Sequence, residues 1–386
     1  MTRLSNQTER EPVSMRTSRR GLLPLRRVRC SARPLLTLTA VALLTSACFG
    51  AAPTGWSAAQ PDRTMVYASM ASGRVVAAEA ASGQRRWEYP PENNLGMPYY
   101  PPAVGNDVVV VPNTHNNGAK ALALRASDGQ RLWEQDLRNA ESVPMPPKSA
   151  PLVARDTVYL GLADGSVVAL DVANGTRRTG FTFKARDAIW GQPVLRDGTL
   201  YVTSMDHTLY ALDPDTGQVR RSFRANGAIP GSVAFGRYLY VSSLDETVYA
   251  LDPATLELRW TARTGGWVWS EPLVDGDALY VGSFDRKLYA IDASTGEIRW
   301  TSTLGGRIRP KPVLAGDWIV AGADDGKIYA VTRSGQQEWT FNAGGPVVSP
   351  MTAEGDLVYA SDNSSHRIFA LDIRARTVRW ELPSNR

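Results

Sequence analysis

An eleven-residue motif recurs along most of the chain at intervals of about 40 residues. Its clearest copy, residues 290–300, has the sequence AIDASTGEIRW. The last position of the motif falls on Trp87, Trp133, Thr179, Arg221, Trp260, Trp300, Trp339 and Trp380. A repeat of this length that contains several short strand patterns is typical of β-propellers. We therefore predict an all-β chain: an eight-bladed β-propeller of four-stranded antiparallel blades over residues 62–386.

One repeat unit shows how each blade is built. Residues 271–274, 278–282, 288–292 and 297–300 are rich in β-branched and aromatic side chains, and Asp, Gly and Ser separate them. This is the pattern of four short strands joined by tight turns. A helical apolar period is missing, so we expect little helix. A single such sheet has two faces to cover, which favours a closed ring of blades.

The tryptophans support this interpretation. Six of the eleven occupy the last motif position: Trp87, Trp133, Trp260, Trp300, Trp339 and Trp380. On the outermost strand, an indole in this position can reach the neighbouring blade and pack against it. Thr179 and Arg221 replace it in the third and fourth units, either through drift or because the surface there has another use. The first unit lacks a clear first strand, and residues near Trp56 are the candidates to supply it.

Residues 1–47 have the features of an export signal of the lipoprotein type. A basic stretch precedes the apolar run 35–44, which is shorter than the roughly 20 residues that a membrane span needs. Small residues then lead to Cys48, in a pattern that resembles the bacterial lipobox, where the cysteine carries the lipid. A cleaved secretion signal and an uncleaved anchor are the alternatives. Arg19 and Arg20 also resemble a twin-arginine signal, and Met15 is an alternative start.

Residues 48–61 are rich in Ala, Pro, Gly and Ser and are predicted to form a tether. Together with the signal, they predict an extracytoplasmic lipoprotein that a lipid anchor at Cys48 holds at a membrane of the cell envelope. In a source with two membranes this is the periplasm or the outer membrane.

The net charge of +5 does not indicate a nucleic-acid partner. Nine of the 43 basic residues and two of the 38 acidic residues precede residue 48. From residue 48 onward there are 34 basic and 36 acidic residues. The basic character belongs to the leader, so the body lacks the basic footprint of nucleic-acid binding.

Few side chains are available for chemistry. The only cysteines are Cys30 and Cys48, and the three histidines, His115, His207 and His366, lie far apart in the sequence. Neither a Ser–His–Asp set nor a Cys–His set is visible, and the carboxylates recur too regularly to nominate a pair. We expect no catalytic residues, no metal site and no enzymatic activity.

The motif also carries a family resemblance. Ala290, Asp292, Thr295, Gly296 and Trp300 match the pattern A-x-D-x-x-T-G-x-x-x-W. This pattern resembles the repeat of the pyrroloquinoline-quinone (PQQ)-like propeller superfamily. In length, leader and repeat number the chain resembles the branch of outer-membrane assembly lipoproteins called BamB. That branch implies a non-enzymatic, eight-bladed scaffold without a cofactor.

Two sets of loops are expected to converge on one face of the ring: those that lead into the first strands (first-strand loops) and those between the second and third strands (2–3 loops). Aromatic and arginine side chains are common where proteins bind proteins. The candidates in the first-strand loops are Tyr99, Tyr100, Trp190, Trp267, Trp269, Arg307 and Arg309. The alternative is that these aromatics close the central channel. The aspartates of the 2–3 loops are expected to form turns.

Three functions remain open. The first is a monomeric scaffold that binds envelope proteins, as the BamB resemblance implies. The second is a PQQ-dependent dehydrogenase or electron-transfer accessory. The third is a propeller that binds or senses a glycan or another small ligand.

Overall fold

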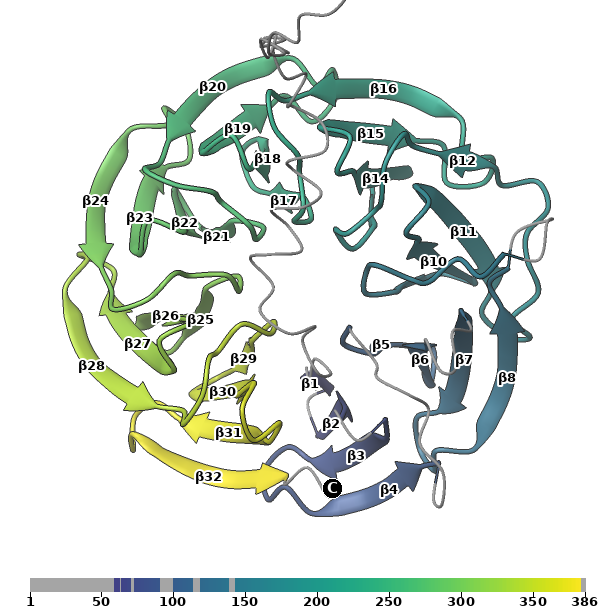
Figure 1. The fold of residues 1–386 in the computed structure, drawn as a ribbon, viewed down its shortest axis with the longest axis horizontal. Helices are drawn as coiled ribbons and strands as arrows, with labels where there is room; N and C mark the ends of the chain where they lie inside the picture. Colours follow the sequence, from purple (N-terminus) through teal and green to yellow (C-terminus); the bar gives the residue numbers. More distant parts are fainter. Residues whose placement is uncertain are drawn as a thin grey trace, which may run out of the picture. The chain divides into compact units, whose positions relative to one another are not determined.

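The computed structural model describes residues 59–62, 64–70, 73–90, 100–113, 119–138 and 143–382. In these segments every regular element is a β-strand, and the strands form eight four-stranded antiparallel sheets in a ring (Figure 1). The predicted eight-bladed β-propeller is confirmed. The export signal, Cys48 and Trp56 lie outside the described residues.

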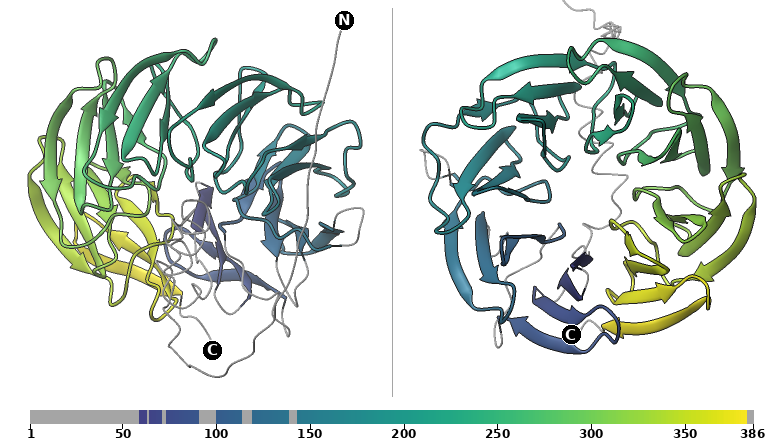
Figure 2. Two further views of the ribbon diagram at one scale, coloured as in Figure 1. Left: turned by 45° about the horizontal axis from the view of Figure 1, so that its top comes forward. Right: turned by 180° about the vertical axis from the view of Figure 1, so that it is seen from behind.

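The blades follow one another along the chain, with the first strand of each nearest the centre and the fourth outermost (Figures 1 and 2). Blade 1 contains β1 (Ala59–Asp62), β2 (Met65–Ser69), β3 (Val75–Glu79) and β4 (Arg85–Tyr89). Blade 2 contains β5 (Ala103–Gly105), β6 (Val108–Asn113), β7 (Lys120–Arg125) and β8 (Arg131–Asp136). Blade 3 contains β9 (Leu152–Ala154), β10 (Thr157–Gly161), β11 (Ser166–Asp171) and β12 (Phe183–Lys184). Blade 4 contains β13 (Val194–Arg196), β14 (Thr199–Thr203), β15 (Thr208–Leu212) and β16 (Val219–Arg224).

The second half of the ring repeats the same layout. Blade 5 contains β17 (Ala234–Phe235), β18 (Leu239–Ser242), β19 (Thr247–Leu251) and β20 (Leu258–Arg263). Blade 6 contains β21 (Leu273–Asp275), β22 (Ala278–Gly282), β23 (Lys287–Asp292) and β24 (Ile298–Thr303). Blade 7 contains β25 (Val313–Ala315), β26 (Trp318–Gly322), β27 (Lys327–Thr332) and β28 (Gln337–Asn342). Blade 8 contains β29 (Thr352–Glu354), β30 (Leu357–Ser361), β31 (Ile368–Asp372) and β32 (Thr377–Leu382).

Two strands differ from the sequence-based expectation. The first strand of blade 1, β1, begins at Ala59 and pairs with β2, just after Trp56, where the sequence placed the candidates for it, but inside the segment predicted as a tether. The propeller therefore starts before the predicted boundary at residue 62. In blade 3 the outer strand β12 is only two residues long and begins after Thr179, so that residue is not on the strand.

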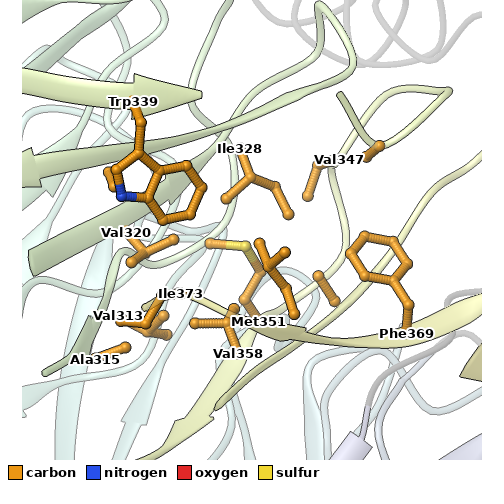
Figure 3. Close-up of a cluster of buried hydrophobic side chains, with 14 residues drawn as sticks. Val313, Ala315, Val320, Ile328, Trp339, Val347, Met351, Val358, Phe369 and Ile373 are labelled. Atoms are coloured by element: carbon orange, nitrogen blue, oxygen red, sulfur yellow. The ribbon is translucent and has the colours of Figure 1, made fainter. Parts of the chain in front are cut away.

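A cluster of buried apolar side chains lies in each of the eight seams between blades. Figure 3 shows the cluster between blades 7 and 8, where Trp339 and Ile328 of blade 7 meet Met351, Val358 and Phe369 of blade 8. The second and third strands are covered on both faces, which is why they are continuously apolar in sequence. The ring, rather than any single sheet, is thus the folding unit.

The repeated alanine and tryptophan of the motif lie opposite each other in the sheet. Ala290 of β23 pairs with Trp300 of β24, and the third and fourth strands shift register just after this pair. The same alanine–tryptophan pairing occurs in the blades of Trp87, Trp133, Trp260, Trp339 and Trp380. The small side chain on the third strand leaves the indole free to lean toward the next blade.

Five of the indoles donate a hydrogen bond across a seam. The acceptor is a backbone carbonyl in the turn between the third and fourth strands of the next blade. The Nε1–O distances are 2.8 Å for Trp87–Ala126 and Trp133–Val172, 3.2 Å for Trp260–Ala293, 2.9 Å for Trp300–Arg333 and 2.8 Å for Trp380–Ala80. The last of these joins blade 8 to blade 1, so the final repeat closes the ring (Figure 1).

The glycine of the motif lies against the indole of the preceding blade. Gly296 has φ +80°, and a Cβ atom there would lie 2.6 Å from the Trp260 ring. Glycine is therefore required both for the positive φ and for the close approach. At the seam between blades 7 and 8, Arg376 takes this position with φ 57°, and its guanidinium lies 5.9 Å from the centroid of the Trp339 ring.

The aspartate of the motif organises the same turn. In blade 6, the Asp292 side chain accepts hydrogen bonds from the amides of Ser294 (2.8 Å) and Thr295 (2.9 Å) and from Arg299 (2.7 Å). Arg299, followed by the amide of Ser294, lowers the pKa of Asp292 from 3.8 to about 2. The equivalent pairs Asp213–Arg220 and Asp252–Arg259 likewise hold the aspartate pKa at about 2.

These pairs predict a pH dependence of stability. A carboxyl group whose pKa is lower in the folded state stabilises the fold above its unfolded pKa and loses this effect as the pH falls. We therefore expect the wild type to melt at a higher temperature than Arg299→Ala above pH 4, and the difference to shrink between pH 3.8 and 2. Thermal melts across this range measure it. A difference that stays constant down to pH 2 would contradict the assignment.

Candidate binding face

The first-strand loops are extended, and their side chains alternate between the core and the surface. Before β21, Val268 is fully buried, and its neighbours Trp267 and Trp269 are half-buried. Before β25, Ile308 is fully buried between the exposed Arg307 and the half-buried Arg309. The alternation therefore directs two large side chains of each loop away from the core, toward the surface of the protein.

The 2–3 loops are bonded to the first-strand loops of the same blades. The amide of Phe284 donates to the carbonyl of Trp267 at 2.9 Å, and that of Asp324 donates to Arg307 at 3.0 Å. Blades 4 and 5 repeat this bond, from Met205 to Ala188 and from Leu244 to Ala228. Both sets of loops are thereby held on one face of the ring.

Four aromatic side chains and one arginine meet on this face, and we call them the aromatic cluster: Trp190, Trp267, Trp269, Phe284 and Arg309. The rings of Trp190 and Trp269 pack edge to face with centroids 5.5 Å apart, and Trp269 stacks on Phe284 at 6.0 Å. Trp267 lies 5.9 Å from Phe284, and the Arg309 guanidinium lies over the same ring at 5.5 Å. Aromatic pairs and cation–π contacts at these distances are favourable.

The cluster draws on three blades. Trp190 precedes β13 of blade 4, the Trp267–Phe284 group belongs to blade 6, and Arg309 precedes β25 of blade 7. The first-strand loop of blade 5, between them, has Gly231, where a Cβ atom would lie 2.6 Å from the amide nitrogen of Glu271. The first-strand loop of blade 5 thus packs closely against that of blade 6, and Trp190 of blade 4 contacts Trp269 of blade 6.

The other predicted site residues are spread more widely. Arg307 is exposed and its amide binds the Asp324 carboxylate at 2.7 Å. Tyr100 is half-buried in the first-strand loop of blade 2, and Tyr99 lies outside the described residues. The prediction did not include Phe284, although it was visible as the aromatic residue before Asp285 where the equivalent loops have Met205 and Leu244.

The aspartates of the 2–3 loops take part in turns. Asp285 accepts from the amide of Lys287 at 3.0 Å and from the Tyr289 hydroxyl, which also accepts from the amide of Gly265 at 3.0 Å. Burial, followed by the hydrogen bond to Asp285, raises the pKa of Tyr289 to about 12. A Cβ atom at Gly265 would lie 2.6 Å from the same carboxylate. These contacts are structural.

Within the described segments, His, Cys, Asp and Glu side chains nowhere gather in threes that could hold a metal ion. The same part of the chain has no helix of the length and apolar character needed to cross a membrane.

The chain resembles known proteins in sequence and in fold. The family model described as "Outer membrane protein assembly factor BamB" matches residues 40–186, 178–266, 220–306 and 287–386. No curated protein matches the chain in sequence. Among solved structures, BamB from Moraxella catarrhalis is similar with a TM-score of 0.67 and 22% identity, over 79% of this chain and 90% of that one. The computationally designed Ika8 protein has the same TM-score at 15% identity, over 84% and 95% of the two chains.

Proposed function

The chain belongs to the family described as outer membrane protein assembly factor BamB, and from this membership we propose that it is a non-enzymatic scaffold that binds other proteins of the cell envelope. The proposal includes no cofactor and no chemical step. Binding takes place on the face that carries the aromatic cluster.

The aromatic cluster is the observation that carries this proposal. Tryptophan and arginine are the residues most enriched among those that contribute strongly to protein–protein affinity. Here three tryptophans and an arginine lie together, each half-buried, so that part of every side chain remains accessible. The loops that hold them are bonded to one another, which reduces the ordering cost of binding.

The proposed location follows from the leader. We propose that Cys48 is lipidated and that the lipid holds the propeller at the outer membrane, with the tether between them. The family described as an outer membrane assembly factor supports this location, as does the lipobox-like pattern before Cys48.

Site-specific photo-crosslinking tests the binding face. A photoreactive residue in place of Arg307 is expected to yield discrete crosslinks to envelope proteins in cells of the source organism. The matched control replaces Leu132, which is 38% exposed on the outer strand β8 of blade 2, away from this face. The control should yield no discrete product.

The same assay tests whether the aromatic cluster itself contributes to binding. Adding Trp269→Ala to the Arg307 probe should lower the crosslink yield at least about tenfold, because such residues contribute about 2 kcal/mol or more to binding. A melting curve of each variant shows that the propeller remains folded. Equal yields from positions 307 and 132, or a yield that Trp269→Ala leaves unchanged, would refute the proposed face.

A further inference from the structure

Two neighbouring seams of the ring lack the indole that fills the others. They follow blades 3 and 4, where the motif ends in Thr179 and Arg221. Each seam contains a cavity, of about 310 Å³ between blades 3 and 4 and about 350 Å³ between blades 4 and 5. The cavities therefore lie where the repeat departs from its own pattern.

The cavity between blades 4 and 5 is lined by the counterparts of the residues that hold an indole elsewhere. In the next seam, Trp260 packs against Tyr240 at 5.7 Å, donates to Ala293 and lies on Gly296. The same positions one blade earlier are Tyr201, Pro253 and Leu256, and all three line the cavity. The seam has kept two of these contacts, Tyr201 and Pro253, and has Leu256 in place of the glycine.

The hydrogen-bond acceptor of this site also remains in place. The Ala293 carbonyl accepts both the Tyr240 hydroxyl, at 2.8 Å, and the Trp260 indole, at 3.2 Å. The Pro253 carbonyl accepts the Tyr201 hydroxyl at 3.1 Å. A carbonyl oxygen has two lone pairs, so Pro253 can accept a second donor, as Ala293 does.

The charges around the cavity indicate what the incoming segment carries. Arg196, Arg220 and Arg221 line it, against Asp197 from the same wall. Arg196 is paired with Asp197 at 3.6 Å and Arg220 with Asp213, whereas Arg221 is exposed and takes part in none of the ion pairs found among the described residues. The Arg196 guanidinium lies 4.8 Å from the centroid of the Phe235 ring at the cavity wall.

The cavity between blades 3 and 4 is the weaker candidate. Its arginines, Arg155 and Arg178, are balanced by Asp156 and Asp215. The ring of Phe181 already packs against Tyr159 there, with centroids 5.7 Å apart.

We propose that the cavity between blades 4 and 5 is a docking site for a tryptophan side chain in an acidic segment of a partner protein. The indole packs on Tyr201 beside Leu256, displaced from the position that the chain's own indoles take over glycine, and donates to the Pro253 carbonyl. Flanking carboxylates pair with Arg196 and Arg221. This site extends the proposed scaffold function, but it lies at the turns between the first and second strands and between the third and fourth strands, not at the loops that carry the aromatic cluster. Each proposal can therefore fail without the other.

A fluorinated peptide tests the site directly. The probe is an acetylated pentapeptide with one 5-fluorotryptophan between acidic residues (DEWED), observed by fluorine NMR against the purified propeller. We expect saturable binding with a dissociation constant of about 1 mM or lower. The matched peptide DEAED, measured by competition with the fluorinated probe, should bind at least about tenfold more weakly. The basic peptide KRWRK, which carries its own fluorinated tryptophan, should also bind at least about tenfold more weakly.

Two variants locate the binding. Arg221→Trp combined with Leu256→Gly restores the repeat pattern and fills the cavity with the chain's own indole, so it should abolish binding. Arg196→Gln combined with Arg221→Gln changes only exposed groups and should weaken binding about tenfold. Trp269→Ala on the other face should leave the peptide affinity unchanged. Absence of saturable binding, equal binding of the basic peptide, or loss of binding only in Trp269→Ala would overturn the proposal.

Discussion

Replacing Trp380 with alanine is expected to lower the free energy of unfolding by about 3–5 kcal/mol, the range for a large aromatic removed from a packed core. Trp380 is buried, lies 5.8 Å from the Tyr359 ring and rests on Gly83 of blade 1. Its indole donates to the Ala80 carbonyl at 2.8 Å. Alanine removes this hydrogen bond and leaves a void at the seam where the last blade meets the first.

Urea unfolding followed by tryptophan fluorescence and circular dichroism measures this effect. The matched control is Arg221→Ala, which changes the same motif position at a site where the side chain is exposed. Surface substitutions of this kind change stability by about 0.5 kcal/mol or less. A loss below about 1 kcal/mol for Trp380→Ala would mean that the ring does not depend on this indole for closure.

The blade architecture was predictable because each position of the motif has a local physical role. Within blade 6 the predicted strand 278–282 coincides with β22, and 288–292 differs from β23 by one residue. Turn residues such as Asp292 and Gly296 mark the strand ends in any copy of the repeat. Strand number and order therefore followed from sequence.

Features that depend on contacts between blades were less predictable. The first strand β1 has the composition of a linker, and its place in the sheet follows from pairing with β2 rather than from its own pattern. The shortness of β12 likewise has no signal beyond Thr179 in place of tryptophan. The extent of both strands is determined by their pairing with the neighbouring strands, β2 and β11.

The aromatic cluster was predictable in its members but not in its geometry. Trp190, Trp267 and Trp269 depart from the repeat, so sequence comparison between blades singles them out. Trp190 contacts Trp269 directly, from a loop almost 80 residues away. Phe284, which belongs to a different loop type, lies against both Trp267 and Trp269. Sequence periodicity predicts the order of the loops around the ring, but it does not predict which side chains of different loops come into contact.

Two motif positions on neighbouring blades depart from the pattern together after blade 4, whereas Gly217 is kept after blade 3, where Thr179 replaces the indole. Where an indole is present in the preceding blade, the next blade has Gly83, Gly129, Gly175, Gly296 or Gly335 beneath it, or Arg376 over Trp339. After blade 4, where Arg221 replaces the indole, the glycine position is Leu256, buried and with φ 60°. Leu256 thus partly fills the space that an indole leaves.

This pairing predicts strong coupling between positions 221 and 256. Leu256→Gly alone should cost about 2 kcal/mol, because the lost apolar burial exceeds the strain relieved at a positive φ. Arg221→Trp alone should cost about 1–2 kcal/mol, because Leu256 occupies the place where glycine receives the indole. The double variant should recover wild-type stability, which gives a favourable coupling of about 3 kcal/mol in a double-mutant cycle measured by urea unfolding. Strictly additive losses would show that the two positions act independently and that the seam between blades 4 and 5 is not an indole site with its side chain missing.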